Sequence, residues 1–586
     1  MFLVITFVLL PGCLLFTLYY YYNKVYNHFF QVIKANYVPD SIEIQDPILL
    51  NIENGSIPTW LNGIMYRIGP GKFNIQQNDG SLFSIRHAFD GLPFMHRFEV
   101  CGRTQTLKYN SRLLAKSVET NISNKSYKGM LFFGHQPCLS FFQWLSHFCI
   151  RFYKLVFLSE LNDGLPADGH MVGVTATPNL PLPSSVKGNN KNILVAKTDA
   201  NLLQKIHAET LKPQHVFDYS AFDKHLNGQF SAAHHQTDHF TKETYNFTLA
   251  IIPYPRLIVF KISKDGEKTT ILANITHRYD GSPICPSYIH SFWLTKEYII
   301  IPESPMIIKN RGVDILMHGS FISGMKWDSN APTYLHVIDR NSVDQNGLVA
   351  SIPAPGFYTF HVGNGFESTC SNTGDKLLTL NCVSFSNGDI LHQLHTFGVP
   401  HSKGPDQQQQ QTYLNGFAYP PKYQTSFGDL MQYQLNLNQM ALVSTKTLAE
   451  NIEFPRFNQN FSMTAKHRYM YGCQLSRFTE KRDESICLIK IDLNDLSTTL
   501  YGDEQEGLTC SEPIFVSRPP NYSKTEEEEE DDGVLLTFVS DFKCCYFIVI
   551  NAKDMKELAR IKIGDFTAIT FHGSFVDHEF KSVNIN

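Results

Sequence analysis

Four histidines in this chain share a setting that suits a buried metal ligand. Each follows a short run of small, aromatic or β-branched residues, a composition typical of buried strands. They are His234, His290, His361 and His572. A buried imidazole needs a partner for each ring nitrogen, and a metal ion together with a nearby acceptor supplies both. A core histidine bonded to the backbone is the alternative for any one of them, but the recurrence of the setting favours a shared metal.

The ligand types narrow the choice of metal. Four neutral imidazoles suit a borderline divalent ion, so iron, zinc and copper are all admissible. A structural zinc site is less natural without a thiolate or carboxylate ligand. Each ligating ring needs an acceptor for its second N–H, and three acidic residues in buried-looking contexts could provide it: Asp199, Glu453 and Glu512. The alternative for each carboxylate is to cap a turn or to pair with arginine or lysine.

Strands rather than helices have to position these side chains. From about Ile57 the chain consists of short strand-like runs broken by Gly, Pro, Asn and Asp. This pattern continues almost to the C-terminus and predicts an all-β sandwich or propeller, with no fixed-period WD or kelch motif. Because the four histidines are far apart in sequence, we expect a closed ring of strands to aim them at a common axis.

Composition excludes some classes of function. Of the 586 residues, 43% are apolar and 13% aromatic, as expected for many strands around a large apolar interior. The net charge of -5 gives no reason to expect nucleic acid as a partner. The twelve cysteines form no CxxC pairs, which argues against a disulfide framework or a zinc ribbon and indicates a reducing compartment.

The N-terminal segment, residues 1–23, is apolar and carries no charged side chain. It is long enough to span a bilayer, and the tyrosines at its end suit a membrane interface. The first basic residue, Lys24, follows the apolar run, which favours an uncleaved anchor over a cleavable signal peptide. We therefore expect a membrane anchor at 1–23, a linker at 24–56 and one β domain at 57–586.

Two further stretches depart from the strand pattern. Residues 139–157 are apolar and aromatic, which predicts a helix lying in a membrane interface with Arg151 and Lys154 reaching toward water. An ordinary buried helix is the alternative. Residues 523–533 carry a run of acidic side chains, which predicts an extended, solvent-exposed loop.

Several stretches together resemble the carotenoid cleavage oxygenase family. They are the segments around the four histidines, Trp60–Gly71, Phe89-Asp90-Gly91, Glu453-Phe454-Pro455 and residues 511–517. The likeness runs in family order from about Ile57 to Phe575. It implies an all-β fold, a seven-bladed β-propeller capped by loops and helices, with Fe(II) on its axis. It also implies that the iron ligands are His234, His290, His361 and His572, of which the last three are held by Asp199, Glu453 and Glu512 respectively.

Two neighbouring positions bear on this implied site. Asp199 replaces a glutamate of the family, so its carboxylate is one methylene short, and we expect a backbone shift or a bridging water. Thr198 matches a threonine that in relatives lies beside the metal and restricts one coordination position.

The resemblance implies an Fe(II)-dependent dioxygenase that cleaves a conjugated C=C bond of a carotenoid or apocarotenoid, with O2, into two carbonyl products. The segment after Pro137 resembles the membrane-docking segment of the family, so we expect membrane lipid as a partner and a catalytic part that faces the cytosol. A retinoid isomerohydrolase with the same metal site, and a carotenoid-binding regulator without catalysis, are the alternatives.

Overall fold

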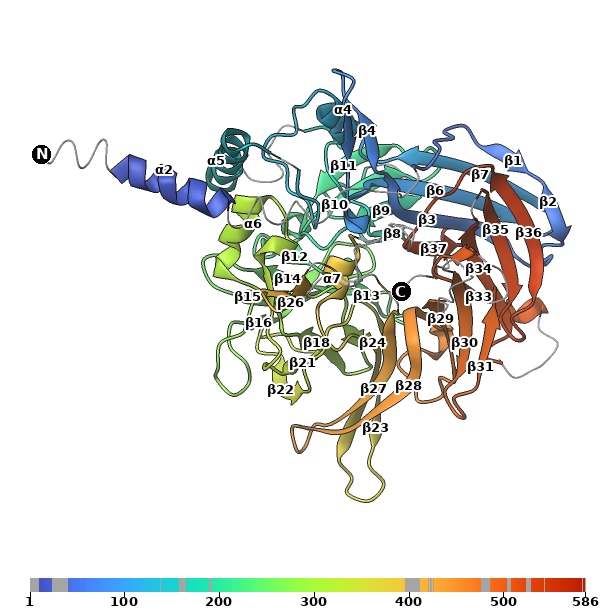
Figure 1. Ribbon diagram of the computed structural model, residues 1–586. Coiled ribbons are helices and arrows are strands. Elements are labelled where there is room, and N and C mark those ends of the chain that lie inside the picture. The colour runs from blue at the N-terminus through green and yellow to red at the C-terminus, as the bar shows by residue number, and fades with distance from the viewer. Residues whose placement is uncertain are drawn as a thin grey trace, which may run out of the picture.

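The protein is built mostly of β-strands (Figure 1). The computed structural model describes residues 10–23, 40–137, 139–157, 165–188, 192–395, 412–419, 421, 424, 426–475, 485–502, 507–522, 529–541, 543–581 and 583–584. This architecture agrees with the expected all-β class and is consistent with a propeller.

One six-stranded sheet contains strands from both the beginning and the end of the β domain. Its order is β1-β7-β6-β3-β37-β38, so β3 pairs with β6 on one side and with β37 on the other. In Figure 1 the blue strands of this sheet lie beside the red ones. Its strands are β1 (Ile48–Leu50), β3 (Asn62–Lys72), β6 (Leu92–Cys101), β7 (Thr106–Leu113), β37 (His572–Val576) and β38 (Val583–Asn584).

Three smaller sheets follow one another along the chain. The first holds β8 (Thr175–Pro178), β9 (Ile193–Lys197), β10 (Leu203–His207) and β11 (Pro213–Phe217). The second holds β12 (Phe230–Ser231), β13 (Gln236–Thr237), β14 (Thr244–Ala250), β15 (Arg256–Ile262) and β16 (Thr269–Ile275). The third holds β17 (Trp293–Leu294), β18 (Tyr298–Glu303), β21 (Thr333–Asp339) and β22 (Leu348–Ala354).

The largest sheet has 13 strands because the long strand β28 joins two parts of it. Strand β28 (Ala441–Arg456) pairs with β27 over most of its length and with β29 at its end. The other strands are β2 (Ile52–Gly55), β23 (Val362–Thr369), β24 (Lys376–Ser384), β27 (Gly428–Asn436), β29 (Tyr469–Leu475), β30 (Ile486–Asp492), β31 (Thr498–Tyr501), β32 (Thr509–Cys510), β33 (Ile514–Ser517), β34 (Gly533–Ser540), β35 (Cys545–Asn551) and β36 (Glu557–Gly564).

Short strand pairs and helices complete the described chain. The pairs are β4 (Asn74–Gln76) with β5 (Leu82–Ser84), β19 (Met306–Ile308) with β20 (Met325–Trp327), and β25 (Thr412–Leu414) with β26 (Phe417–Tyr419). The α-helices are α2 (Leu10–Tyr21), α4 (Lys116–Ser123), α5 (Phe141–Phe157), α6 (Val313–His318) and α7 (Ile390–Gln393). The single 3-10 turns are η3 (Ala88–Asp90), η4 (Tyr219–Ala221), η5 (Asn310–Gly312), η6 (Ile322–Gly324), η8 (Gln459–Phe461) and η9 (Pro520–Tyr522).

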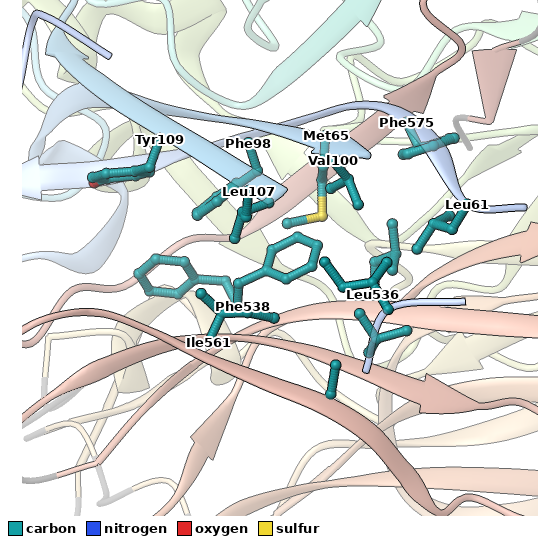
Figure 2. Packing of buried hydrophobic residues seen from close by; sticks show 14 of the residues in the cluster. Leu61, Met65, Phe98, Val100, Leu107, Tyr109, Leu536, Phe538, Ile561 and Phe575 are labelled. Atoms are coloured by element: carbon teal, nitrogen blue, oxygen red, sulfur yellow. The ribbon is translucent and has the colours of Figure 1, made fainter. Parts of the chain in front are cut away.

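Apolar side chains between neighbouring sheets form the core. Figure 2 shows Met65 and Phe98 of the six-stranded sheet packed against Leu536 and Phe538 of β34. All four are fully buried. Because such interiors are close-packed, we expect truncation of Phe538 to alanine to cost about 3–5 kcal/mol of unfolding free energy.

The helix expected at residues 139–157 is present as α5, and α2 packs against it (Figure 1). The Tyr22 ring contacts Phe141 and Trp144, and its hydroxyl donates to the Leu139 carbonyl at 2.8 Å. Residues 1–9 of the expected anchor lie outside the described residues. Among the residues that are described, no helix combines the length and the apolar character needed to cross a bilayer.

The side chain of Arg151 on α5 does not point in the direction that we expected. Its side chain is buried rather than directed toward water, and its guanidinium donates to the carbonyls of Leu316 and Met317 at 2.6 and 3.1 Å. These carbonyls belong to the last turn of α6, where a cation is favourable. Arg151 therefore links the two helices.

Two other segments are more ordered than the sequence pattern predicts. Within the expected linker, β1 and β2 pair with β7 and β36. In the described end of the acidic run, Glu530 and Asp531 are buried, which corrects the predicted exposure. Glu530 accepts from His467 at 2.8 Å, and Asp531 pairs with Lys490 at 2.7 Å. Every cysteine that the structure describes is a free thiol.

Candidate metal centre

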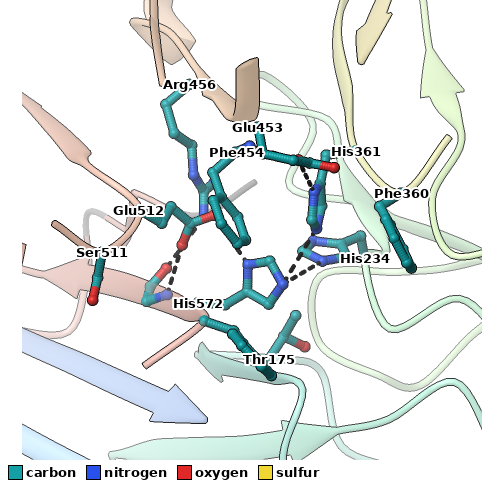
Figure 3. Close-up of polar contacts among 12 residues, drawn as sticks. Thr175, His234, Phe360, His361, Glu453, Phe454, Arg456, Ser511, Glu512 and His572 are labelled. Atoms are coloured by element: carbon teal, nitrogen blue, oxygen red, sulfur yellow. Dashed lines mark hydrogen bonds and ion pairs between the residues drawn. The ribbon is translucent and has the colours of Figure 1, made fainter. Parts of the chain in front are cut away.

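The four histidines expected to bind a metal come together in the structure. Their candidate ligand atoms all lie within 4.8 Å of one another, and all four side chains are buried. Each histidine lies where a segment enters a strand: His234 between β12 and β13, His290 before β17, His361 before β23, and His572 at the start of β37. Figure 3 shows His234, His361 and His572 converging on one point.

Each of the three expected carboxylates contacts its expected histidine. The Nδ1 atom of His290 lies 2.8 Å from Asp199 Oδ2. The Nδ1 atom of His361 lies 2.6 Å from Glu453 Oε2, and that of His572 lies 3.0 Å from Glu512 Oε1. A carboxylate accepts a hydrogen bond, so each of these rings carries its proton on Nδ1.

The position of those protons determines what the centre can hold. With Nδ1 protonated, the Nε2 atoms present lone pairs, and the Nε2 of His572 lies 3.3 Å from those of His234 and His361. Burial lowers the pKa of His234 well below its usual range and that of His572 to about 3, so both rings are neutral. Lone pairs that face one another in a buried site call for a cation, and this donor set fits a borderline divalent metal.

Glu512 is the most strongly anchored of the three carboxylates. It pairs with Arg456 at 2.7 Å and accepts from the Gly573 amide at 2.9 Å, while Arg67 lies 3.8 Å away. Burial raises the pKa of the Glu512 carboxyl, but Arg456 and His572 outweigh burial and hold it well below the usual range. Glu512 is therefore an anion in the folded protein and a strong acceptor for His572.

Asp199 reaches His290 directly, although it is one methylene shorter than glutamate. Its Oδ2 also accepts from the Tyr288 hydroxyl at 2.6 Å, and its Oδ1 lies 3.3 Å from the Ala233 amide. The direct contact makes the expected water bridge unnecessary. Tyr288 was not singled out from the sequence, although it lies only two residues before His290 in the same motif.

The backbone amide of the next residue holds the Glu453 carboxylate in place. Its Oε2 also accepts from the Phe454 amide at 2.6 Å, and Phe454 adopts a φ of 56°, which is unusual for a bulky residue. This conformation places the Phe454 ring against His361 and His572, with centroids 5.1 and 5.5 Å apart. The strained backbone is therefore part of how these imidazoles are packed.

Two threonines lie near the histidines. Thr198, which we expected beside the metal, lines the adjoining cavity together with Asp199. Thr175 was not expected, because the strand Thr175–Pro178 has no distinctive motif. Figure 3 shows Thr175 beside His572, and its hydroxyl donates to the Ala233 carbonyl at 3.0 Å.

A largely apolar cavity of about 240 Å³ adjoins the metal centre and is called here the front cavity. His290, His361 and His572 form part of its wall. Aromatic side chains form much of the remainder, including Phe89, Phe133, Phe230, Phe321, Phe360 and Phe571. Such a lining suits a long hydrophobic ligand with few polar groups.

Known proteins similar to this chain point to one family. The family model described as retinal pigment epithelial membrane protein matches residues 37–577. The carotenoid dioxygenase of Neurospora crassa is 27% identical over 579 residues, which cover 91% of this chain and 89% of the relative. The torulene dioxygenase of Fusarium fujikuroi is 27% identical, covering 91% of each chain. The mitochondrial carotenoid-cleaving dioxygenase of Homo sapiens is 26% identical, covering 89% and 87%.

A solved structure shows the same fold. The cobalt-substituted apocarotenoid oxygenase of Synechocystis superposes with a TM-score of 0.66 at 18% identity, covering 92% of this chain and 97% of that one. Because the family model matches nearly the whole chain, the protein belongs to the retinal pigment epithelial membrane protein family of carotenoid oxygenases, as its histidine and carboxylate motifs led us to expect.

Proposed function

We propose that this protein is a dioxygenase that cleaves a conjugated C=C bond of a carotenoid or apocarotenoid into two carbonyl products. The observation that carries the proposal is the placement of a four-histidine centre in the wall of an apolar, aromatic cavity. The names of the fungal and human relatives support the same chemistry. The reaction is balanced, since both atoms of O2 enter the two carbonyl groups and no external reductant is consumed.

The resident metal in this proposal is Fe(II), held by His234, His290, His361 and His572. Bound Fe(II) supplies activation of O2 next to the polyene. Four neutral ligands leave the ion its full positive charge, while Asp199, Glu453 and Glu512 fix the ring orientations and keep the proton on Nδ1.

The aromatic wall supplies binding and orientation. A polyene has no charged group, so its affinity comes from burial of apolar surface and from ring contacts. The Phe360 ring packs on His290 with centroids 5.4 Å apart, which places an apolar surface directly at the metal centre. The same lining excludes bulk water from the bond that is cleaved.

The architecture proposed is a seven-bladed β-propeller with a helical and loop cap. Seven groups of antiparallel strands support it. The six-stranded sheet, the three smaller sheets, and three segments of the 13-stranded sheet centred on β24, β29 and β34 each supply one group. His572 begins β37, and the other three metal-centre histidines lie one to three residues before a strand, as expected if those strands line an axis.

A membrane surface is the proposed source of substrate. Exposed apolar side chains gather on α2 and α5, where Phe16 is 71% exposed and Phe142 is 78% exposed. These helices lie side by side and next to α6 (Figure 1). Phe321, which lines the front cavity, packs against an apolar cluster that includes Ile315 of α6, so the cavity approaches this surface. Lipid-soluble substrates would then enter from the bilayer, with the β domain on its cytosolic side.

Sedimentation with liposomes tests the membrane proposal. Replacing Phe142 by aspartate should release most of the protein from neutral liposomes, because a charge would have to enter the lipid interface. The matched control is Val343→Asp, since Val343 is 84% exposed in a turn between β21 and β22. Equal release by the two variants would contradict the proposed surface.

The cleavage proposal is tested by anaerobic purification, metal analysis and product analysis under air. β-Carotene and a long apocarotenal are suitable substrates. Stoichiometric iron together with new aldehydes or ketones and matching O2 consumption is the expected result. A retinoid ester converted to an isomerised alcohol without O2 would instead identify an isomerohydrolase. An iron-loaded protein that transforms neither class would be a binding protein, and the catalytic proposal would fail.

A further inference from the structure

Two segments next to the metal centre bring hydroxyl groups to the wall of the front cavity. They are residues 509–511, which include strand β32, and residues 568–571, which directly precede His572. The Cys510 side chain packs into an apolar core cluster, so in extended chain the Ser511 side chain points to the opposite side, toward the cavity. Ser511 is only 8% exposed. A hydroxyl buried to this degree needs a hydrogen-bond partner for its oxygen and for its proton.

Arg67 determines the direction of the hydroxyl of Thr570. Its guanidinium is fully buried, and its Nε and Nη2 atoms donate to Thr570 Oγ1 at 3.1 and 3.0 Å. A guanidinium has no acceptor, so both bonds use lone pairs of the threonine oxygen. A hydroxyl oxygen has two lone pairs and one proton. Thr570 therefore has no acceptor position left and can only donate.

The proton of Thr570 in turn orients the hydroxyl of Ser511. The Thr570 hydroxyl donates to Ser511 Oγ at 2.9 Å. Ser511 accepts this bond, so its own O–H is left to donate, and the Ser511 oxygen is directed away from the Glu512 carboxylate (Figure 3). Within the described chain the Ser511 O–H donates to no protein acceptor. The front cavity thus has in its wall one O–H donor whose acceptor has to come from a ligand or solvent.

Other hydroxyl groups at the cavity lack this fixed direction. Thr198 and Thr509 also line the cavity, but no hydrogen bond within the described chain fixes their protons, so each is able to donate or to accept. The Tyr288 hydroxyl already donates to Asp199. Ser511 differs because its O–H ends a chain of hydrogen bonds that begins at a charged guanidinium, which strengthens it as a donor.

We propose that Ser511 binds the carbonyl oxygen of an apocarotenoid, and that Arg67 and Thr570 are positioning residues that keep its O–H directed at the ligand. The inference rests on the proposed function and names its preferred substrate, a polyene that ends in a conjugated aldehyde or ketone rather than a hydrocarbon carotene. A carbonyl oxygen only accepts, which matches a group that only donates. A hydroxyl end group would bring a further proton that needs an acceptor in a largely apolar wall.

The single hydrogen bond would set the direction of the ligand. The remaining lining is mostly apolar and aromatic, and apolar contacts hold a polyene equally well in either direction. A donor on one wall only makes one of the two directions more favourable. Ser511 therefore acts on which end of an asymmetric substrate lies beside Glu512 and His572.

Anaerobic titration of the iron-loaded full-length protein, followed by quenching of its tryptophan fluorescence, tests the proposal. Without O2 the ligands stay intact, so binding is measured whether or not the protein cleaves them. Ser511→Ala should weaken binding of a long apocarotenal about three- to tenfold, as expected for one neutral hydrogen bond, and leave binding of β-carotene within about twofold. Ser511→Thr keeps the hydroxyl and should retain most of the aldehyde affinity. The matched control is Ser287→Ala, because Ser287 is also buried but donates to the Ser304 carbonyl at 2.9 Å and does not line the cavity.

The infrared carbonyl band of the bound apocarotenal is a second readout, one that a purely structural role would not move. In the unmodified protein the band should lie below its position in hexane, because a hydrogen bond weakens the C=O bond, and in Ser511→Ala it should return toward that position. A band at the hexane position in the unmodified protein would overturn the proposal, whether or not Ser511→Ala folds. An equally shifted band in Ser511→Ala would also overturn it and place the donor at Thr198 or Thr509. Absence of carbonyl products under air would refute the cleavage proposal instead and would leave the binding result unchanged.

Discussion

Replacing Asp199 by asparagine should weaken metal binding while leaving the fold intact. Asp199 Oδ2 accepts from His290 Nδ1 at 2.8 Å and from the Tyr288 hydroxyl at 2.6 Å. Asparagine is nearly the same size, and its amide oxygen still accepts, but it has no negative charge. A hydrogen bond to a charged group contributes about 1.5–3 kcal/mol and a neutral one about 0.5–1.5 kcal/mol.

The expected loss follows from that difference. At about 1–1.5 kcal/mol for each of two hydrogen bonds, the upper limit is about 2–3 kcal/mol. Because only the bond to His290 acts on the metal directly, we expect a 10–100-fold loss of affinity, on the order of that measured for such outer partners. His290 would also lose the anion that holds its proton on Nδ1.

Competition with a chromogenic Fe(II) chelator under anaerobic conditions measures this affinity. The matched control is Asp223→Asn, because Asp223 lies 2.7 Å from the Nδ1 of His225 in an exposed pair. That variant should bind Fe(II) as tightly as the unmodified protein. An affinity within about twofold of the unmodified protein for a folded Asp199→Asn would refute the role that we assign to this carboxylate.

Three further predictions concern stability. Removing the metal with a chelator should lower the melting temperature by several degrees, since a metal at a thousandfold excess over its Kd stabilises the folded protein by about 4 kcal/mol. Refilling the site with Fe(II) should restore the melting temperature. An unchanged melting curve would contradict a preformed metal site. Arg456→Met should lower the unfolding free energy, measured in urea, by about 3–5 kcal/mol, because it leaves the buried Glu512 carboxylate with only the more distant Arg67. A loss below about 1 kcal/mol would show that the Arg456–Glu512 ion pair is dispensable for stability. Burial lowers the pKa of His96 to about 3, so the unfolded chain takes up a proton below pH 6.5 that the native state does not, and stability falls as pH drops from 6.5 toward 3. His96→Phe should flatten that slope by up to about 1.4 kcal/mol per pH unit and leave it unchanged above pH 7; an equal slope in both proteins would contradict a neutral His96.

The sequence pattern singled out the four histidines as candidate metal ligands, and the structure brings them together. The histidines carry a local signal, because buried strands select small, aromatic and β-branched neighbours. The strand pattern from Ile57 onward predicted the fold class for the same reason. The pairing of Asp199, Glu453 and Glu512 with three of the histidines was implied only by the resemblance to the carotenoid cleavage oxygenases. The helix at 139–157 was also predictable, because its composition differs from that of the strands around it.

Features that depend on distant parts of the chain were not predictable. Arg151 was expected to reach toward water, yet it binds the last turn of α6. Glu530 was expected in an exposed acidic loop, yet His467 binds it in the interior. Whether a charged side chain is solvated or buried depends on the partner that the fold brings to it.

The metal centre shows both what local sequence determines and what only tertiary structure decides. His234 and His572 are 338 residues apart in sequence, and only the fold brings their Nε2 atoms to 3.3 Å. The direct reach of Asp199 to His290 and its second bond to Tyr288 likewise belong to tertiary structure. Residue types and local patterns determine which groups are able to bind a metal. Distances, proton positions and the cavity beside the metal centre arise only when strands from distant segments pack side by side.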